Sequence, residues 1–185
     1  TLFTATSATC VTGLIIYDTF QHWSYFGQCV IIAMIQIGGL GLVTLRTCFN
    51  FMIGKKHRLR KMQLASDSVS SDGFGDANHL MKNIIKVSLT IEGIGMLILM
   101  TVFVPKFGVK GIFTSFFISV SAFCNAGFDV LGQNTAFASV TEYYNNPIVL
   151  ITIMLLIMCG GLGFIVWYDL VKYKKTKHLE LHTKL

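Results

Sequence analysis

Two short segments of small and polar residues follow the same order of residue types. The first reads Ser7-Ala8-Thr9-Cys10-Val11-Thr12-Gly13, and the second reads Ser121-Ala122-Phe123-Cys124-Asn125-Ala126-Gly127. Neither has a charged side chain, and both end in glycine, which permits backbone angles that other residues avoid. Segments of this kind can offer backbone carbonyl oxygens to a cation that has shed its water. The absence of carboxylates favours a monovalent ion over calcium.

We expect the last five residues of each segment to carry this chemistry. The alternating β-branched and small residues at 9–13 favour an extended backbone, and the small side chains of both segments let neighbouring strands approach one another. Residues 1–8 are expected to be the C-terminal end of a short helix. Residues 108–122 are expected to form a helix that is too short to span a bilayer. The negative end of each helix would point at the ion. The candidate residues are Thr9, Cys10, Val11, Thr12, Gly13, Phe123, Cys124, Asn125, Ala126 and Gly127.

The composition indicates a membrane protein. Hydrophobic residues make up 53% of the chain and charged residues only 13%, against about 25% charge in an ordinary soluble domain. Residues 19–45 and 143–168 contain no Asp, Glu, Lys or Arg, and residues 87–104 contain only Glu92. Because roughly 20 apolar residues span a bilayer as a helix, these stretches predict three spanning helices. They also predict contact with lipid.

The basic residues predict the orientation in the membrane. All of the 15 Lys and Arg residues except Lys106 and Lys110 fall within residues 46–86 or 172–184. Lys and Arg accumulate on the cytoplasmic side of spanning helices, so these segments are expected to be cytoplasmic and the two glycine-ended segments external. A cytoplasmic flank accounts for the basic run at residues 55–61, and nucleic-acid binding is not expected.

A second doubled motif, Gly-Gly-Leu-Gly, occurs in the long apolar stretch after each segment, at residues 38–41 and 160–163. Chance rarely repeats an order of elements. The order predicts an all-α membrane protein built from helix–pore loop–helix repeats, like a potassium channel. The expected divisions are residues 1–53 (end of a first repeat, with pore helix end, filter strand and inner helix), 54–79 (cytoplasmic connection), 80–171 (second repeat, its leading helix broken by Pro105) and 172–185 (basic cytoplasmic tail).

These motifs together resemble the Trk/Ktr/HKT superfamily of potassium uptake proteins, and most of all the membrane subunit of a bacterial Ktr-type system. The matching motifs are Ser-Ala-x-Cys-Val-Thr-Gly-Leu, Gln36-Ile37-Gly38-Gly39-Leu40-Gly41, Ser121-Ala122-Phe123-Cys124-Asn125-Ala126-Gly127-Phe128-Asp129 and Gly160-Gly161-Leu162-Gly163-Phe164-Ile165. The resemblance covers nearly the whole chain, which matches the end of the first of four repeats and all of the second.

The resemblance implies a transporter in the cell membrane, not an enzyme. Potassium (K⁺) would pass through a selectivity filter of backbone carbonyls, with Gly13 and Gly127 as filter glycines, and sodium (Na⁺) would modulate or accompany it in some relatives. The resemblance further implies a homodimer that sits on a cytoplasmic ring of nucleotide-binding regulatory subunits. Arg46 departs from the family pattern, because the family usually keeps that helix uncharged.

Three polar residues outside the two segments are further candidates. Asp129 follows the second segment directly, and it either concentrates cations at the pore mouth or bonds the loop backbone. Glu92 is a carboxylate within a spanning helix, which is costly and marks a functional candidate. Its structural alternative is a hydrogen bond to a neighbouring helix or to Ser88. Gln36 either faces the pore or packs between helices. The Gly-Gly-Leu-Gly motifs suit close helix packing better than gating.

Three other functions are alternatives to potassium uptake alone. A sodium/potassium cotransporter (a symporter) of the same superfamily fits the same motifs. A structural membrane subunit without transport has no use for the doubled loop pattern. A membrane enzyme using Glu92 with Asp129 or a histidine needs these groups at one depth, whereas the histidines lie outside the apolar stretches. The only metal expected is potassium at the two loops.

Overall fold

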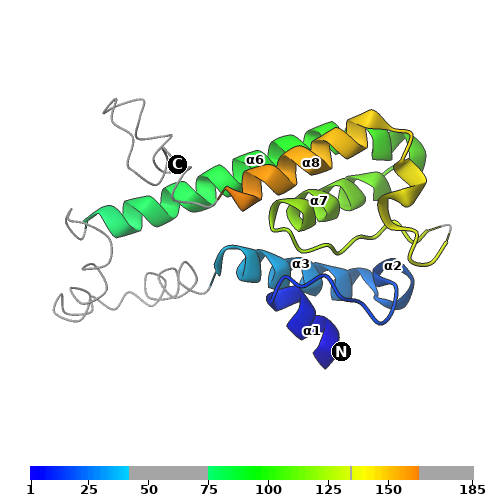
Figure 1. The fold of residues 1–185 in the computed structure, drawn as a ribbon, viewed down its shortest axis with the longest axis horizontal. Helices are drawn as coiled ribbons and strands as arrows, with labels where there is room; N and C mark the ends of the chain where they lie inside the picture. The colour runs from blue at the N-terminus through cyan, green and yellow to red at the C-terminus, as the bar shows by residue number, and fades with distance from the viewer. Residues whose placement is uncertain (42–74, 134, 163–185) are drawn as a thin grey trace.

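The computed structural model describes residues 1–41, 75–133 and 135–162, and this part of the chain is helical with no β-strand (Figure 1). The all-α fold class is therefore confirmed for the described residues. Its elements are α1 (Leu2–Thr9), α2 (Thr19–His22), α3 (Tyr25–Gly39), α6 (Gly75–Phe107), α7 (Lys110–Phe123), the 3-10 helix η1 (Ser139–Tyr143) and α8 (Pro147–Gly161).

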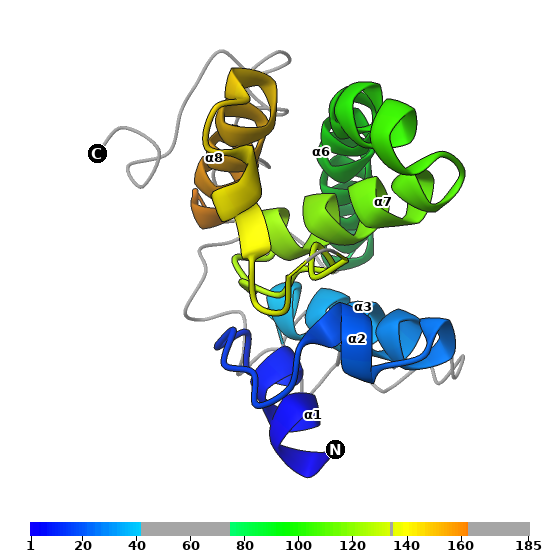
Figure 2. The same ribbon diagram turned by 90° about the vertical axis from the view of Figure 1, so that its right-hand side faces the viewer.

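The helices form two units, which we call the first unit (residues 1–41) and the second unit (residues 75–162). In the second unit, α6, α7 and α8 all pack against one another. In the first unit, α1 packs against α3, and α3 in turn contacts α7. Figure 2 shows the first unit lying beside α7, across from α6 and α8. The short helix α7 is thus held between longer helices, whereas α1 packs against α3.

Side-chain caps fix where three helices begin. The carboxylate of Asp18 accepts hydrogen bonds from the amides of Phe20 and Gln21 at the start of α2, and the Ser24 hydroxyl accepts one from Gly27 at the start of α3. Asn146 does the same for α8, whose first residue is Pro147. Such caps satisfy amides that have no partner within the helix. Helix α2 lies in the connection between the first segment and α3.

The expected helix break at Pro105 is wrong. Helix α6 runs through this proline to Phe107 and ends at Gly108, whose φ is +60°. Pro105 lies in the last turn, so its missing N–H removes one hydrogen bond near an end that frays in any case. The amide of Gly108 still bonds to the carbonyl of Val104 at 2.8 Å. Glycine with positive φ is the usual helix terminator, and it ends α6 where proline does not.

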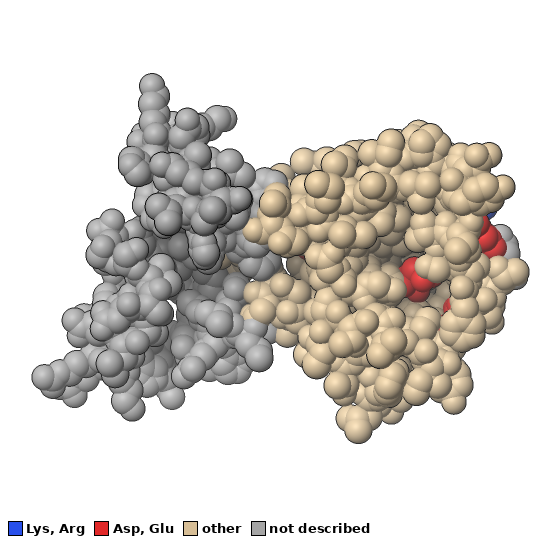
Figure 3. Space-filling model, in the orientation of Figure 1, with Lys and Arg blue, Asp and Glu red and all other residues tan. Residues whose placement is uncertain are grey.

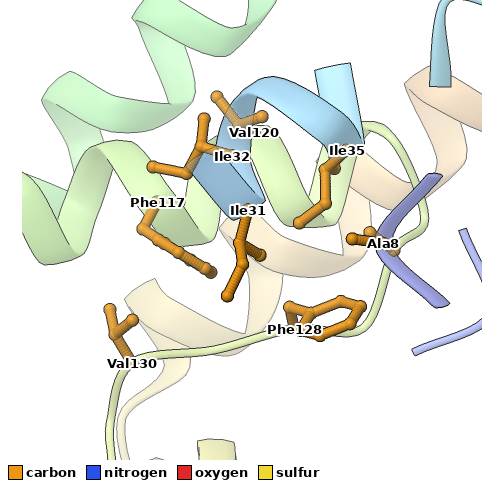
Figure 4. Packing of buried hydrophobic residues seen from close by; sticks show 9 residues of the cluster. Ala8, Ile31, Ile32, Ile35, Phe117, Val120, Phe128 and Val130 are labelled. Carbon is orange, nitrogen blue, oxygen red and sulfur yellow. The ribbon is translucent and has the colours of Figure 1, made fainter. Parts of the chain in front are cut away.

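The main hydrophobic core joins the two units. Ile31, Ile32 and Ile35 of α3 meet Phe117 and Val120 of α7 (Figure 4). Each of these side chains is buried. The remaining members come from α1 and from the chain after α7, namely Ala8, Ala126, Phe128 and Val130. Because burying one such side chain is worth about 1.5–3 kcal/mol, this cluster fixes α1, α3 and α7 relative to one another.

Among the described residues, one helical segment is long and apolar enough to cross a membrane, Ile84–Phe107, with a mean hydropathy of 2.1. Helices α3 and α8 are apolar but shorter, and the inner ends expected for them fall in residues 42–53 and 163–171, outside the described residues. The same holds for Arg46, most of the cytoplasmic connection and the basic tail. Figure 3 shows that the described part of this face is nearly free of charge, with its few acidic side chains on the right.

Candidate functional site

The chain leaves α1 through a hydrogen-bonded cap that fixes the start of the first predicted ion-binding segment. The amide of Thr12 donates to the carbonyl of Ser7 at 3.0 Å, and the amide of Val11 donates to the carbonyl of Ala8 at 3.3 Å. These two bonds define a Schellman cap, which satisfies carbonyls that the helix leaves free. The Thr12 hydroxyl adds a bond of 2.9 Å to the Ser7 hydroxyl. We call residues 9–13 the first loop.

The chain leaves α7 through the same cap. The amide of Ala126 donates to the carbonyl of Ser121 at 2.8 Å, and the amide of Asn125 donates to the carbonyl of Ala122 at 3.1 Å. The Ser121 hydroxyl bonds onward to the carbonyl of Phe128 at 2.5 Å. We call residues 123–127 the second loop. The repeat seen in the sequence is therefore also a repeat of backbone hydrogen bonds.

Neither loop is the extended strand that its composition indicates, and this expectation is corrected. Val11 and Asn125, the third residues of the two loops, have φ of 55° and 57°. Gly13 and Gly127, the fifth residues, have φ of 72° and 73°. The Schellman cap requires a left-handed residue directly after the helix, which rules out a continuous strand. Asparagine and glycine tolerate this conformation, but a β-branched valine does so only with strain.

The carbonyl oxygens of both loops are left without hydrogen bonds. Within the described part of the chain, no group donates a hydrogen bond to the backbone carbonyls of residues 10–13 or 124–127. All of these residues except Ala126 are exposed or half-buried, so water or a cation can reach their carbonyl oxygens and supply the missing partner. The two runs stand at equivalent positions of the two loops.

The two loops converge at their glycines. A Cβ atom built on Gly13 would lie 2.6 Å from the carbonyl oxygen of Ala126 and 3.4 Å from the Cα of Gly127. A Cβ atom on Gly127 would lie 3.5 Å from the Cα of Gly13. Only residues without a side chain allow two backbones to approach this closely. The two loops therefore meet where Gly13 contacts the backbone of Ala126 and Gly127.

The first glycine of each Gly-Gly-Leu-Gly motif packs on the end of the short helix of its own unit. A Cβ atom on Gly38 would overlap the carbonyl oxygen of Thr9, and a Cβ atom on Gly160 would overlap the carbonyl oxygen of Phe123. Thr9 and Phe123 are the last residues of α1 and α7. Both glycines thus let a long helix touch the backbone from which a loop starts. This is the geometry that close packing requires.

The second glycine of the first motif reaches across to the other unit. A Cβ atom on Gly39 would lie 2.5 Å from Sγ and 2.6 Å from Cβ of Cys124, in the second loop. The equivalent Gly161 has nothing within 4 Å in the described part of the chain. The end of α3 therefore contacts both loops, through Gly38 in its own unit and Gly39 in the other.

Asp18 joins the outer loops of the two units, a role that the sequence did not reveal. One carboxylate oxygen caps α2 through the amides of Phe20 and Gln21, each at 2.9 Å. The other accepts a hydrogen bond from the amide of Phe137 at 2.8 Å. The Gln21 side chain adds a bond of 3.0 Å to the carbonyl of Gly132. The sequence signal that could have pointed to it is an aspartate directly before Thr19, since aspartate is a preferred N-cap residue.

Asp129 lies just beyond the second loop, half-buried, and one of its carboxylate oxygens accepts a hydrogen bond of 3.0 Å from the amide of Leu131. It therefore bonds the loop backbone, as one of its two expected roles requires. Its other expected role, at a pore mouth, is compatible with its place after Gly127 and stays a prediction.

Glu92 and Gln36 form a hydrogen-bonded pair between α6 and α3. The side-chain amide of Gln36 donates to Oε1 of Glu92 at 2.9 Å. Glu92 is only 3% exposed. Its backbone carbonyl accepts a hydrogen bond from the hydroxyl of Ser119 in α7, at 2.6 Å. Ser88, the other partner considered for Glu92, is buried and its hydroxyl has no hydrogen bond among the described residues.

The comparisons with known proteins agree on one family. A family model described as TrkH, a cation transport protein, matches residues 1–184. The chain is 42% identical to the potassium/sodium uptake protein NtpJ of Enterococcus hirae over its whole length, which is 40% of that protein. It is 40% and 38% identical to the Ktr system potassium uptake proteins B of Bacillus subtilis and Vibrio alginolyticus, again over 40% of each.

The chain belongs to the TrkH family of cation transport proteins, as its resemblance to the Trk/Ktr/HKT superfamily predicts. It spans about 40% of the length of these relatives. The apolar segment Ile84–Phe107 of α6 is long and apolar enough to cross the membrane that this family implies.

Proposed function

We propose that the protein containing this chain takes up potassium ions across the cell membrane, through a filter lined by the backbone carbonyls of the two loops. The unpaired carbonyls of residues 10–13 and 124–127 carry this proposal. A permeating cation needs oxygens in place of its hydration shell, and these oxygens have no competing donor. The names of three relatives, each a potassium uptake protein, support potassium as the ion.

The surroundings of the loops suit a monovalent cation. Helices α1 and α7 both end at a loop, so the partial negative charge of each helix C-terminus falls on the ion site. Neither loop contains a charged residue. A site of neutral dipoles binds weakly enough for the ion to leave again, which conduction requires. Asp129, directly after the second loop, adds negative charge at the mouth.

Sodium is the second ion in this proposal. NtpJ is named a potassium/sodium uptake protein, and it is 42% identical to this chain. Sodium either enters with potassium, as in a symporter, or passes the same filter less readily. Competition between the two ions in one uptake assay separates these cases, because a cotransported ion stimulates uptake at low concentration and a competing ion inhibits it.

The names of the relatives also support a proposal for how this protein assembles with other subunits. Two of them are named as parts of a Ktr system, which describes a membrane component that works with others. We propose a homodimer bound to a cytoplasmic nucleotide-binding regulatory subunit. The basic residues within residues 46–86 and 172–184 would face that subunit and the cytoplasm, since Lys and Arg accumulate on this side. The divisions at residues 53, 79 and 171 belong to this proposal.

The test is uptake by the complete protein in cells that lack their own potassium uptake, with rubidium, sodium and lithium as competitors. Saturable potassium uptake is expected. In Gly127→Ser, potassium preference over sodium should fall, because a side chain at φ +73° strains the second loop. Gly93→Ala serves as the control, since Gly93 has nothing within 4 Å among the described residues.

Two results would contradict the proposal. Unchanged selectivity in Gly127→Ser, with wild-type transport intact, would remove the filter role of the second loop. Absence of uptake with the protein present in the membrane, both alone and together with the regulatory subunit, would favour the structural subunit without transport.

A further inference from the structure

We propose that Glu92 and Gln36 are positioning residues of the ion path, which hold the second loop in register with the first. The proposal rests on the filter role of the loops. Its core is a chain of contacts from the buried carboxylate of Glu92, through the Gln36 side chain, to Cys124 of the second loop.

The contacts run through one side chain. Gln36 donates to Oε1 of Glu92 at 2.9 Å through its amide nitrogen, and its amide oxygen lies 4.0 Å from Sγ of Cys124, a distance at which the thiol donates a hydrogen bond to it. One amide thereby connects α6 to the second loop. Gln36 lies 56 positions from Glu92 and 88 positions from Cys124 in the chain, so no local structure brings these residues together.

The backbone of α3 brings the first loop into the same arrangement. Two and three residues after Gln36, Gly38 abuts the Thr9 carbonyl and Gly39 abuts Cys124. Glycine contacts of this closeness leave no slack, so a rotation of α3 displaces both loops. The hydrogen bond from Gln36 to Glu92 holds α3 in one rotation, because it links a side chain of α3 to a side chain of α6.

The burial of Glu92 explains why the pair holds one position. Glu92 is 3% exposed, and the backbone around it is tied to α7 by the bond from Ser119. A buried polar side chain that loses its partner costs about 1–3 kcal/mol, so alternative rotations of α3 that separate the pair are disfavoured. In this proposal the hydrogen bond of Glu92, rather than its charge, holds α3 in place. The variant Glu92→Gln separates the two explanations, because it removes the charge and keeps an acceptor for the hydrogen bond.

The experiment uses the complete protein with Glu92→Gln, Glu92→Ala and Gln36→Asn. Glutamine at position 92 keeps an oxygen that accepts from Gln36. Alanine removes the acceptor, and asparagine at position 36 withdraws the amide by one methylene while it keeps its polarity. Thr90→Ala is the matched control, because Thr90 lies on the same helix, is exposed and bonds only to the carbonyl of Lys86.

The first readout is inhibition of rubidium uptake by sodium, per molecule of protein in the membrane. We expect Glu92→Gln and Thr90→Ala to match the wild type. In Glu92→Ala and Gln36→Asn, sodium should inhibit roughly three- to tenfold more strongly, as the loss of one hydrogen bond allows. If Glu92→Gln is as defective as Glu92→Ala, the charge acts and the proposal is wrong. Lower protein amounts with unchanged selectivity also overturn it.

The second readout does not need transport, so it separates this proposal from the proposed function. In complete protein in which every other cysteine is replaced by serine, a water-soluble thiol reagent labels Cys124 alone. Labelling should be several-fold faster in Glu92→Ala and Gln36→Asn than in the parent and in Thr90→Ala, because the loop loses its tie. Equal labelling rates overturn the proposal whether or not the parent transports potassium.

Discussion

Gly13 lies so close to Ala126 that a Cβ atom on Gly13 would be 2.6 Å from the Ala126 carbonyl oxygen. The equivalent glycine of the second loop is less confined, since a Cβ atom on Gly127 would meet only the Cα of Gly13, at 3.5 Å. Both glycines have positive φ, 72° and 73°. The two residues share a backbone conformation but differ in the space around them, although the sequence presents them as equals.

This asymmetry predicts different effects of the same substitution. Gly127→Ala should destabilise the protein by about 1–2 kcal/mol, the cost of left-handed backbone for alanine. Gly13→Ala pays that cost and also pushes the Ala126 carbonyl aside, so its melting temperature should fall further and its potassium uptake should be lower. Thermal unfolding of the purified protein in detergent, beside uptake assays, measures both. Equal losses in the two variants would contradict the asymmetry.

The sequence predicted the helices and the equivalence of the loops because both depend on local patterns. Apolar length marks α6, α7 and α8, and Pro147 marks the start of α8. The doubled order of small residues marks the loops. The predicted helix break at Pro105 was wrong for a local reason too. A proline in the last turn of a helix removes too few hydrogen bonds to end it.

The contacts between the units could not be predicted from the sequence. Gln36 meets Glu92 across 56 residues and Asp18 meets Phe137 across 119. No pattern within either unit specifies these partners, which depend on how α3 packs against α7. The left-handed Val11 was hidden for a different reason. Valine favours strands, and only the hydrogen bonds of the cap after α1 override that preference.

Val11 gives a prediction about stored strain. Its φ of 55° is unfavourable for a β-branched residue, whereas Asn125 holds φ of 57° at the equivalent position with little cost. Val11→Asn should therefore stabilise the protein by about 1 kcal/mol, less whatever packing the valine methyl groups provide. The reverse change, Asn125→Val, should destabilise it by a similar amount. Thermal unfolding of both variants tests the pair, and shifts of the same sign would argue against backbone strain as the cause.

The glycines that touch the helix ends predict a third result. Gly38→Ala and Gly160→Ala should each lower stability by about 2 kcal/mol or more, the cost of overpacking, because the new methyl group overlaps the carbonyl of Thr9 or Phe123. Gly93→Ala, in open space on α6, should be neutral or stabilise the helix by up to about 1 kcal/mol. Melting temperatures of the three variants decide this. A harmless Gly160→Ala would show that α8 does not press on the end of α7.

Asp18 gives the last prediction, which separates an aspartate that joins the units from one that serves the ion. Asp18 accepts three backbone hydrogen bonds and is 7% exposed, whereas Asp129 accepts one. Asp18→Ala should cost about 2–4 kcal/mol, because it removes the cap of α2 and leaves the amide of Phe137 unpaired. Asp129→Ala should lower the stability of the protein by about 1 kcal/mol. It should also raise the KM for potassium at low ionic strength, where salt screens the charge of Asp129 least. Melting temperatures and uptake at two salt concentrations distinguish the roles. A salt-dependent KM change in Asp18→Asn, or none in Asp129→Asn, would reverse the assignment.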